Sequence, residues 1–534
     1  MRLIATLIFL ITSSSLFAQQ LPDPLNGFVH YRTSETNPEA YSYGTLLSSA
    51  SSGISSPAVA DIDGNPANGL EVAVVSRNAR VSVLSATGQI LWEKDLPNAQ
   101  CPDGKNDLAH SSPAIGAIYG NGVPYVVVGY GGLRTKSCGG GVVAFRGHDG
   151  AQGWHFNLKR YAERRKTFAV SYAVFSTPAL ADTNGDGTLE VGFGGLDRYV
   201  YMLSSRGKVL WTYVAADTVF ASPSFYNVDA TPDLEMIIGT DITGNKVIQP
   251  PTSSGGLLYA LKTNKRSKKK FNFRDPQAVV WMQELDQVIQ SSPVVADVIA
   301  GGDHEVIVGS GCYFPSGSKN KLGKWIKIFR LSDGKLLRTL NTEACLSSTV
   351  AIADIDGDST LEIIATTNGS TSVGGSGRSK LSAWKADLPD PIWVTEARSL
   401  GQSDSYLGTI QSPVVADLDG NGSLEVLISN ATAVGIYDAR TGASFGCNER
   451  ICQDNEILLN GTSTLKNTPA IADLNLDGKL DLIVAGTNRN ARRQAVYAWT
   501  NFADLNFSSV GTSASYSLPW GQFKNDARRQ AVYR

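Results

Sequence analysis

The sequence predicts an all-β protein that folds as a single eight-bladed β-propeller with four antiparallel strands in each blade. Three observations lead to this fold class. A phrase of the type Ser-Pro-Ala-Val-Ala-Asp recurs eight times along the 534 residues. Short runs rich in β-branched residues stand between Gly, Asn and Asp turns, which is typical of strands. No long stretch has the 3.6-residue periodicity of an amphipathic helix.

The recurring phrase is expected to form the first strand of each unit. Its copies start 45 to 70 residues apart, so a fixed unit carries loops of different lengths. In repeat folds of this kind each unit buries its apolar surface only against its neighbours. The eight copies occupy residues 56–61, 112–115, 177–182, 222–225, 292–297, 348–354, 412–417 and 468–473.

Three further runs follow each phrase and complete the predicted unit. An apolar run such as residues 70–75 comes after a polar turn, and a run ending in an aromatic or apolar pair, such as residues 200–203, comes next. In several units a fourth run carries a tryptophan, as at Trp92 and Trp211. Four strands in about 50–60 residues favour a propeller over a β-solenoid, whose repeats are shorter and more uniform. A seven-bladed ring is the alternative.

The two ends of the chain are expected to serve export and ring closure. Residues 1–18 have the basic start, apolar centre and small-residue end of a secretory signal peptide. We expect residues 19–54 to supply the outer strand of the last blade, because residues 27–32 resemble the fourth strands of other units. Residues 55–500 are assigned to the propeller, and residues 501–534 to a tail that packs on it. The mature chain has no apolar run long enough to span a membrane.

Export determines how the six cysteines are interpreted. An even number in an oxidising compartment predicts disulfides. The spacing favours sequential pairs, Cys101–Cys138, Cys312–Cys345 and Cys447–Cys452. Lys and Arg number 47 against 49 Asp and Glu, a balance that argues against a nucleic-acid partner.

The turn between the first and second predicted strands carries acids at alternating positions. Carboxylate and amide oxygens at positions 1, 3 and 5, with an acid later, are the pattern by which short loops wrap a hard cation. Calcium, which accepts six to eight oxygens in flexible geometry, suits these loops better than magnesium. The five complete sets are Asp61, Asp63, Asn65 and Glu71; Asp182, Asn184, Asp186 and Glu190; Asp354, Asp356, Asp358 and Glu362; Asp417, Asp419, Asn421 and Glu425; and Asp473, Asn475, Asp477 and Asp481.

Purely conformational turns are the alternative interpretation, because Asp, Asn and Gly are common in hairpin turns. Five acidic loops at one structural position argue for a counter-ion, since crowded carboxylates repel one another. The other three units are degenerate. Residues 117–121 have lost the acids, residues 297–301 keep only Asp297, and residues 227–231 with Glu235 keep a partial set.

The phrase, the acidic Gly-rich loop and the following Leu-Glu-Val together resemble the FG-GAP/VCBS repeat. That family builds the calcium-binding propeller heads of integrin α-subunits and of many secreted bacterial proteins. The resemblance extends over roughly residues 50–500, and residues 519–529 are similar to the C-terminal ending of such bacterial proteins. It implies calcium at the five complete loops. It does not imply one activity, because function on a propeller depends on its loops.

Three functions remain open at this point. The favoured hypothesis is a secreted, periplasmic or cell-surface propeller that binds an extracellular protein or glycan without catalysis. A calcium-dependent enzyme such as a polysaccharide lyase is the second, and a structural subunit of a surface assembly is the third. No serine-hydrolase, zinc-protease or phosphate-loop motif is present, and no catalytic residue is assigned.

Overall fold

The computed structural model describes the greater part of the propeller and fragments of both end segments. Residues 1–18, the predicted signal peptide, lie outside the described residues. The described residues are 23–25, 30–32, 41–43, 45–49, 53–101, 108–132, 138–165, 171–215, 217–241, 255–264, 270–271, 275–315, 318, 322–346, 348–370, 375–376, 379–397, 411–430, 433–444, 452–453, 456–458, 465, 467–488, 491–500, 502, 518, 521–522, 524–526 and 528.

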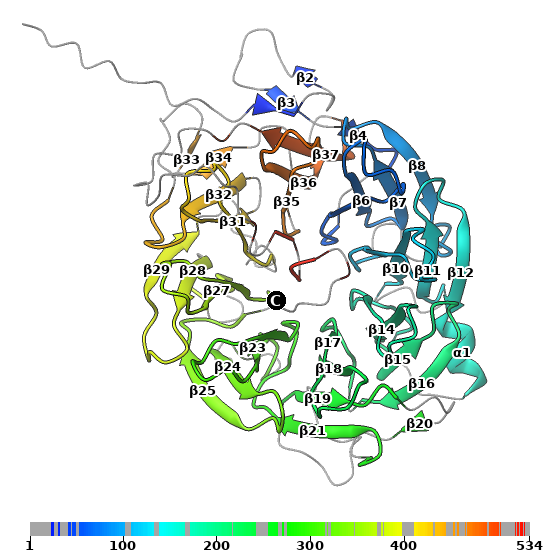
Figure 1. Cartoon of the computed structure of the whole chain (residues 1–534). Coiled ribbons are helices and arrows are strands. Elements are labelled where there is room, and N and C mark those ends of the chain that lie inside the picture. Colours follow the sequence, from blue (N-terminus) through cyan, green and yellow to red (C-terminus); the bar gives the residue numbers. More distant parts are fainter. Residues whose placement is uncertain are drawn as a thin grey trace, which may run out of the picture.

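Eight antiparallel sheets stand around a central axis, which confirms the eight-bladed propeller and excludes the seven-bladed alternative (Figure 1). The strands of each blade follow one another from the axis outward. In blades 1 to 4 they are β5 (Ala58–Ala60), β6 (Glu71–Val75), β7 (Arg80–Leu84) and β8 (Ile90–Asp95); β9 (Ala114–Gly116), β10 (Tyr125–Tyr130), β11 (Gly141–Arg146) and β12 (Gln152–Asn157); β13 (Ala179–Ala181), β14 (Glu190–Gly194), β15 (Tyr199–Leu203) and β16 (Val209–Val214), edged by β20 (Lys270–Phe271); and β17 (Ser224–Tyr226), β18 (Glu235–Gly239), β19 (Leu257–Leu261) and β21 (Val279–Glu284).

Blades 5 to 8 repeat this order. Their strands are β22 (Val294–Ala296), β23 (Glu305–Gly309), β24 (Trp325–Arg330) and β25 (Leu336–Asn341); β26 (Ala351–Ala353), β27 (Glu362–Thr366), β28 (Ser379–Trp384) and β29 (Trp393–Ala397); β30 (Val414–Ala416), β31 (Glu425–Asn430), β32 (Ala433–Asp438), β34 (Glu456–Leu458) and β33 (Cys452–Gln453); and β35 (Ala470–Ala472), β36 (Asp481–Asn488) and β37 (Arg493–Thr500). The short helix α1 (Leu158–Arg164) follows blade 2.

The core lies between neighbouring blades. In blade 1, Ala58 packs with residues of blade 2, whereas Val59 packs with residues of blade 8. Val74 and Val75 of β6 are divided in the same way. Both faces of a blade are therefore apolar, which explains why its strands are continuous apolar runs rather than alternating ones.

A closed ring of buried hydrogen bonds explains the hydroxyl of the recurring phrase. In each blade the backbone N–H of this residue donates to the side-chain oxygen of its counterpart in the next blade, and blade 8 donates back to blade 1. In blade 6 this residue is Thr349, not the preceding serine. The donor–acceptor pairs are Ser56–Ser112, Ser112–Thr177, Thr177–Ser222, Ser222–Ser292, Ser292–Thr349, Thr349–Ser412, Ser412–Thr468 and Thr468–Ser56, at 2.8–3.2 Å.

Tryptophans of the fourth strands join neighbouring blades near the rim. Trp393 Nε1 donates to the carbonyl of Ala439 in the next blade at 2.9 Å. Gly442 lies under its ring at φ +70°, where an added Cβ would stand 2.4 Å from a ring carbon. Trp92, Trp154 and Trp281 contact glycines of the next blade in the same way. The tryptophan and the later glycine are thus one inter-blade contact.

Two pieces of the N-terminal segment lie at the outer edge of blade 8. The strands β1 (Asp23–Pro24) and β4 (Thr45–Leu46) both pair antiparallel with β37. Of residues 27–32, whose composition resembles a fourth strand, the described ones form β2 (His30–Arg32), which pairs with β3 (Tyr41–Tyr43) in a separate two-stranded sheet.

The described residues of the C-terminal tail lie inside the ring, in red in Figure 1. Gly521 O accepts from Ile471 N of blade 8 at 2.8 Å, and Arg528 O accepts from Leu180 N of blade 3 at 3.0 Å. The side chain of Gln522 exchanges two hydrogen bonds with the backbone of Val59 in blade 1. The fully buried Lys524 donates to Pro223 O in blade 4. The tail therefore connects inner strands on opposite sides of the axis.

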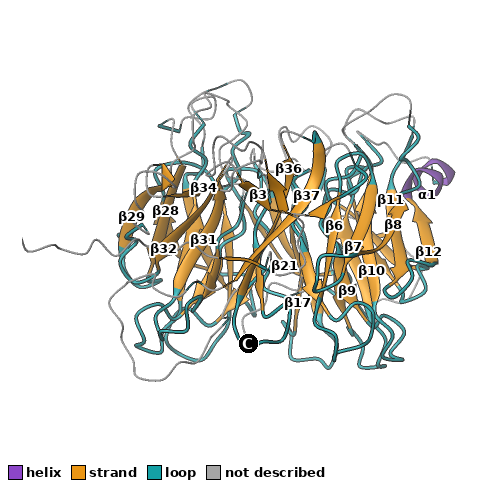
Figure 2. Cartoon of the chain, turned by 90° about the horizontal axis from the view of Figure 1, so that it is seen from above, coloured by secondary structure: helices purple, strands orange, loops and turns teal. Residues whose placement is uncertain are grey.

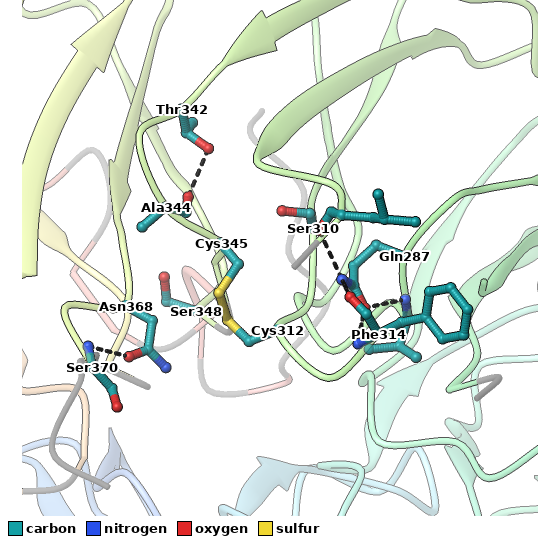
Figure 3. Close-up of a disulfide and its surroundings, with 12 residues drawn as sticks. Gln287, Ser310, Cys312, Phe314, Thr342, Ala344, Cys345, Ser348, Asn368 and Ser370 are labelled. Carbon is teal, nitrogen blue, oxygen red and sulfur yellow. Dashed lines mark hydrogen bonds between the residues drawn. A yellow bond between two sulfur atoms is a disulfide. The ribbon is translucent and has the colours of Figure 1, made fainter. Parts of the chain in front are cut away.

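Two of the three predicted disulfides are confirmed, Cys101–Cys138 and Cys312–Cys345. Each joins the segment between two blades to a loop of an adjacent blade. Beside Cys312, the buried amide of Gln287 donates to the carbonyls of Phe314 and Leu322 and accepts from Phe314 N, so it holds this loop against the ring (Figure 3). Cys447 lies outside the described residues, so the third pair stays a prediction.

Candidate metal centres

The acidic loops share one end of the ring, because every inner strand runs in the same direction along the axis (Figure 2). In blade 7, Asp417 accepts hydrogen bonds from the backbone N–H groups of Asn421 and Gly422 at 3.0 and 2.9 Å. Asp182, Asp354 and Asp473 fold their turns in the same manner. The first acid of the pattern therefore shapes the turn as well as offering oxygens.

A second acid stands at the start of the second strand and is buried beneath the loop. Glu425 and Glu71 have no exposed surface. In each, Oε2 accepts a backbone N–H of the loop at 2.7 Å, from Leu418 and Ile62 respectively. The other oxygen, Oε1, is buried without a hydrogen-bond partner. An unpaired buried carboxylate oxygen is costly unless a cation or a donor meets it.

Three of the five predicted sets bring three carboxylates together. In each, one oxygen from every residue lies within 4.8 Å of the others: Asp61, Asp63 and Glu71; Asp354, Asp356 and Glu362; and Asp417, Asp419 and Glu425. Several carboxylate oxygens converging on one point suit a hard divalent cation such as calcium. The triads of blades 1 and 7, in which the glutamate Oε1 has no hydrogen-bond partner, fit a metal ion.

The sets of blades 3 and 8 have asparagine at the third position and are arranged differently. Asn184 Nδ2 donates to Glu190 Oε1 at 3.0 Å, and Asn475 Nδ2 donates to Asp477 Oδ2 at 3.0 Å. Asp481 is fully buried and accepts from Leu474 N at 2.9 Å. All eight predicted ligands of these two blades lie on the same turn as in the other blades, but with fewer carboxylates at the centre. In blades 1 and 7, Asn65 and Asn421 complete the turn by accepting from Ala67 N and Ser423 N.

Burial makes these acids hard to ionise without a cation. Desolvation, reinforced by Asp419, Asp417 and Asp438, raises the pKa of Glu425 to about 9. Burial likewise raises the pKa of Glu362 to about 7 and that of Asp481 to about 6. The pKa values of Glu71 and Glu190 are raised for the same reason. A divalent ion would reverse these shifts by favouring the charged forms.

Sequence reasoning missed three residues that border the loops. Glu305 of blade 5 is a buried acid at the same position as Glu425, although its loop is degenerate. Asp438 ends the third strand of blade 7, Lys385 follows the third strand of blade 6, and both lie beside the loop acids. The signal was available: both come directly after the aromatic residue that ends the third apolar run.

Comparisons with known proteins support the fold alone. No family model matches the chain, and no curated protein matches its sequence. The quinohemoprotein alcohol dehydrogenase ADHIIG of Pseudomonas putida HK5 is similar over 88% of this chain and 76% of its own, with 13% identity and a TM-score of 0.53. Saccharomyces cerevisiae Sqt1 is similar over 86% of this chain and 100% of its own, with 12% identity and a TM-score of 0.51.

The biofilm matrix protein Bap1 of V. cholerae covers more of the chain with a weaker superposition. The match spans 94% of each chain, at 15% identity and a TM-score of 0.42. Identities this low transfer no activity or ligand. The FG-GAP/VCBS relationship therefore remains a resemblance of sequence pattern.

One further observation concerns the cellular compartment. The two disulfides are typical of proteins outside the cytoplasm. Among the described residues, no helix combines the length and apolar character that crossing a bilayer requires.

Proposed function

We propose that the chain is a secreted, calcium-binding β-propeller that acts as a non-catalytic binding or adhesion module outside the cytoplasm. The observation that carries the metal assignment is the buried Glu425. Its Oε1 has no hydrogen-bond partner and belongs to a carboxylate triad with Asp417 and Asp419. Calcium there would offset most of the negative charge of the triad and hold the turn in one conformation.

The opposite end of the axis offers a surface for the ligand. His110, Phe175 and Phe220 each precede the ring hydroxyl of their blade by two residues, and all three are half-buried. The rings of His110 and Phe175 are 4.3 Å apart, and those of Phe175 and Phe220 are 5.5 Å apart, centre to centre. The ring planes of these two pairs are inclined by 41° and 85°, so the three side chains form a half-buried aromatic cluster rather than a flat stack. Aromatic side chains of this kind can pack against the apolar faces of sugar rings, and on this ground we favour an extracellular glycan over a protein.

Metal analysis of the purified exported chain tests the first part of the proposal. Bound calcium that survives gel filtration, and is removed by a chelator with a fall in the melting temperature, is expected. Absence of calcium together with melting that is insensitive to the chelator would contradict it.

A glycan array tests the second part. We expect the chain to bind a glycan in the presence of calcium. Phe175→Ala should weaken this binding without changing the amount of bound metal. Turnover of a bound polysaccharide would instead favour the lyase hypothesis, and binding only to protein partners would contradict the glycan assignment.

A further inference from the structure

The triad of blade 6 already contains a positive charge from the protein itself. Lys385 follows β28, and its Nζ lies 2.9 Å from Asp356 Oδ2 and 3.8 Å from Glu362 Oε1. It also forms an ion pair with Asp358. The ammonium group therefore contacts three of the four acids that the sequence assigns to a calcium ion in this blade.

Strand register places one residue of every blade at this point. In blade 7, Asp438 is paired directly with Glu425 across β31 and β32. In blade 5, Arg330 is paired with Glu305. In blade 6 the neighbouring pair is Ile363 with Trp384, so Lys385 stands opposite Glu362. The residue that ends the third strand, or directly follows it, thus always faces the start of the second strand, beside the loop.

The identity of this residue divides the blades into two groups. It is basic in blades 2, 4, 5 and 6, and it is a hydroxyl or an acid in blades 1, 3, 7 and 8. The two groups are Arg146, Lys262, Arg330 and Lys385, and Ser85, Ser204, Asp438 and Thr500.

The basic group contains all three blades with degenerate loops. In blade 4, Lys262 Nζ lies 3.7 Å from Asp229 Oδ2, so a lysine again approaches the remaining loop acid. In blades 2 and 5 the arginines pair instead with Asp149 and Asp333 of the next turn. Among the four blades with a basic residue at this position, blade 6 is therefore the one whose loop keeps a complete set of acids.

The buried glutamate of blade 6 also differs from those of blades 1 and 7. Oε1 of Glu71 and Oε1 of Glu425 have no hydrogen-bond partner. Oε1 of Glu362 accepts from the Thr360 hydroxyl at 3.3 Å and lies near Lys385. In blades 1 and 7 the glutamate Oε1 still lacks a partner that a cation could supply, whereas in blade 6 it has partners within the protein. A calcium ion in blade 6 would have to displace an ammonium group of the same sign of charge.

We propose that Lys385 is a built-in counter-ion that takes the cation position of blade 6. The loop of Asp354, Asp356, Asp358 and Glu362 is then held without metal, and calcium binds in blades 1, 3, 7 and 8. This inference rests on the proposed function, because it assumes that the other loops bind calcium. It replaces five expected ions by four.

Equilibrium dialysis with atomic emission analysis of the full exported chain tests the count. Four calcium ions are expected for the wild type and for Lys385→Arg. Five are expected for Lys385→Ser, which places in blade 6 the residue found in blades 1 and 3. Three are expected for the reverse variant Ser85→Lys, which supplies an ammonium group to blade 1 and keeps the test open should Lys385→Ser fail to fold.

The outcomes separate this inference from the proposed function. Five ions in the wild type, or four in both the wild type and Lys385→Ser, would overturn the role of Lys385 alone. An unchanged count in Ser85→Lys would also overturn it. No calcium in any variant would overturn the proposed function, and this inference with it.

Discussion

Blades 6 and 7 carry nearly the same acidic loop but differ in what faces it. Asp354-Ile-Asp-Gly-Asp358 and Asp417-Leu-Asp-Gly-Asn421 both place a carboxylate triad within 4.8 Å. Blade 6 adds the ammonium group of Lys385, whereas blade 7 adds a further carboxylate, Asp438. The comparison teaches that the loop motif determines how the carboxylates are arranged. The residue that faces the loop from the end of the third strand determines the net charge at the triad.

Calcium removal gives the largest expected effect on stability. It should affect the loops of blades 1, 3, 7 and 8, which are proposed to bind calcium, and not the loop of blade 6. Each loop that binds calcium only in the folded state gains roughly 2.7 kcal/mol of unfolding free energy at a free concentration 100-fold above its Kd. Four such sites amount to roughly 11 kcal/mol. Calorimetry with and without chelator should show a large fall in melting temperature. The same transition under both conditions would mean that the loops are ordinary turns.

The pH dependence of the calcium-free protein should be the next largest effect. The pKa of Glu425 is about 9 in the folded protein, above the value near 4.3 of an unfolded glutamate. The folded state therefore binds more protons than the unfolded state between about pH 5 and pH 9, so stability should fall as pH rises through this window. Urea unfolding in chelator at several pH values measures it.

Glu425→Gln is the matched control for that pH dependence. It keeps the shape of the side chain and removes the ionisation, so the slope of stability against pH should become shallower. Glu362→Gln should flatten the slope less, because the pKa of Glu362 is raised only to about 7. Equal slopes in all three proteins would show that other groups dominate.

The joint between blades 6 and 7 can be loosened without touching either loop. Ser412 of blade 7 accepts the buried N–H of Thr349 in blade 6 at 3.0 Å. Ser412→Ala leaves that N–H unsatisfied, which should cost about 1–3 kcal/mol of unfolding free energy. Ser412→Thr, the residue found in three other blades, should cost less. If the variant binds as many calcium ions as the wild type, the ring of hydrogen bonds contributes to stability independently of calcium binding.

The smallest expected effect concerns the extra acid of blade 7. Asp438→Asn keeps an oxygen for the hydrogen bonds from Thr441 N and its hydroxyl, at 2.7 and 2.6 Å, but removes one negative charge near the triad. Calcium affinity at blade 7 should fall by about tenfold, equivalent to about 1.4 kcal/mol. Calorimetric titration would detect the weaker site. If the variant leaves the Kd unchanged, the charge of Asp438 does not contribute to calcium binding in blade 7.

Much of the fold could be predicted because each blade repeats its own local signals. The ring hydroxyls Ser56 to Thr468, the apolar second strands and the tryptophans all recur in order along the sequence. The acidic loops are likewise contiguous, so the chain order alone identifies their residues. Lys385 lies outside these contiguous loops, and its distance along the chain from Glu362 depends on the length of the intervening hairpin loop, so only the aromatic residue before it marks its position. That loop separates β27 from β28 by many residues but β31 from β32 by two.

The closing strands were also hard to place. Residues 27–32 have the composition of a fourth strand, but β1 and β4 contain only two residues each and carry no such pattern. Their position follows from the outer edge that β37 leaves open, which is a property of the assembled ring rather than of the segment itself.

The closure of blade 8 sets an order of events during folding. Within a blade, paired strands are near neighbours in sequence, whereas the hydrogen bond from Thr468 N to Ser56 Oγ joins residues 412 positions apart. Contacts of such long range form slowly, because a long loop must be closed before they are gained. The blades should therefore assemble progressively and the ring should close last. Until then the outer edge of β37 is exposed, and it is the place where an incompletely folded chain is most prone to join another.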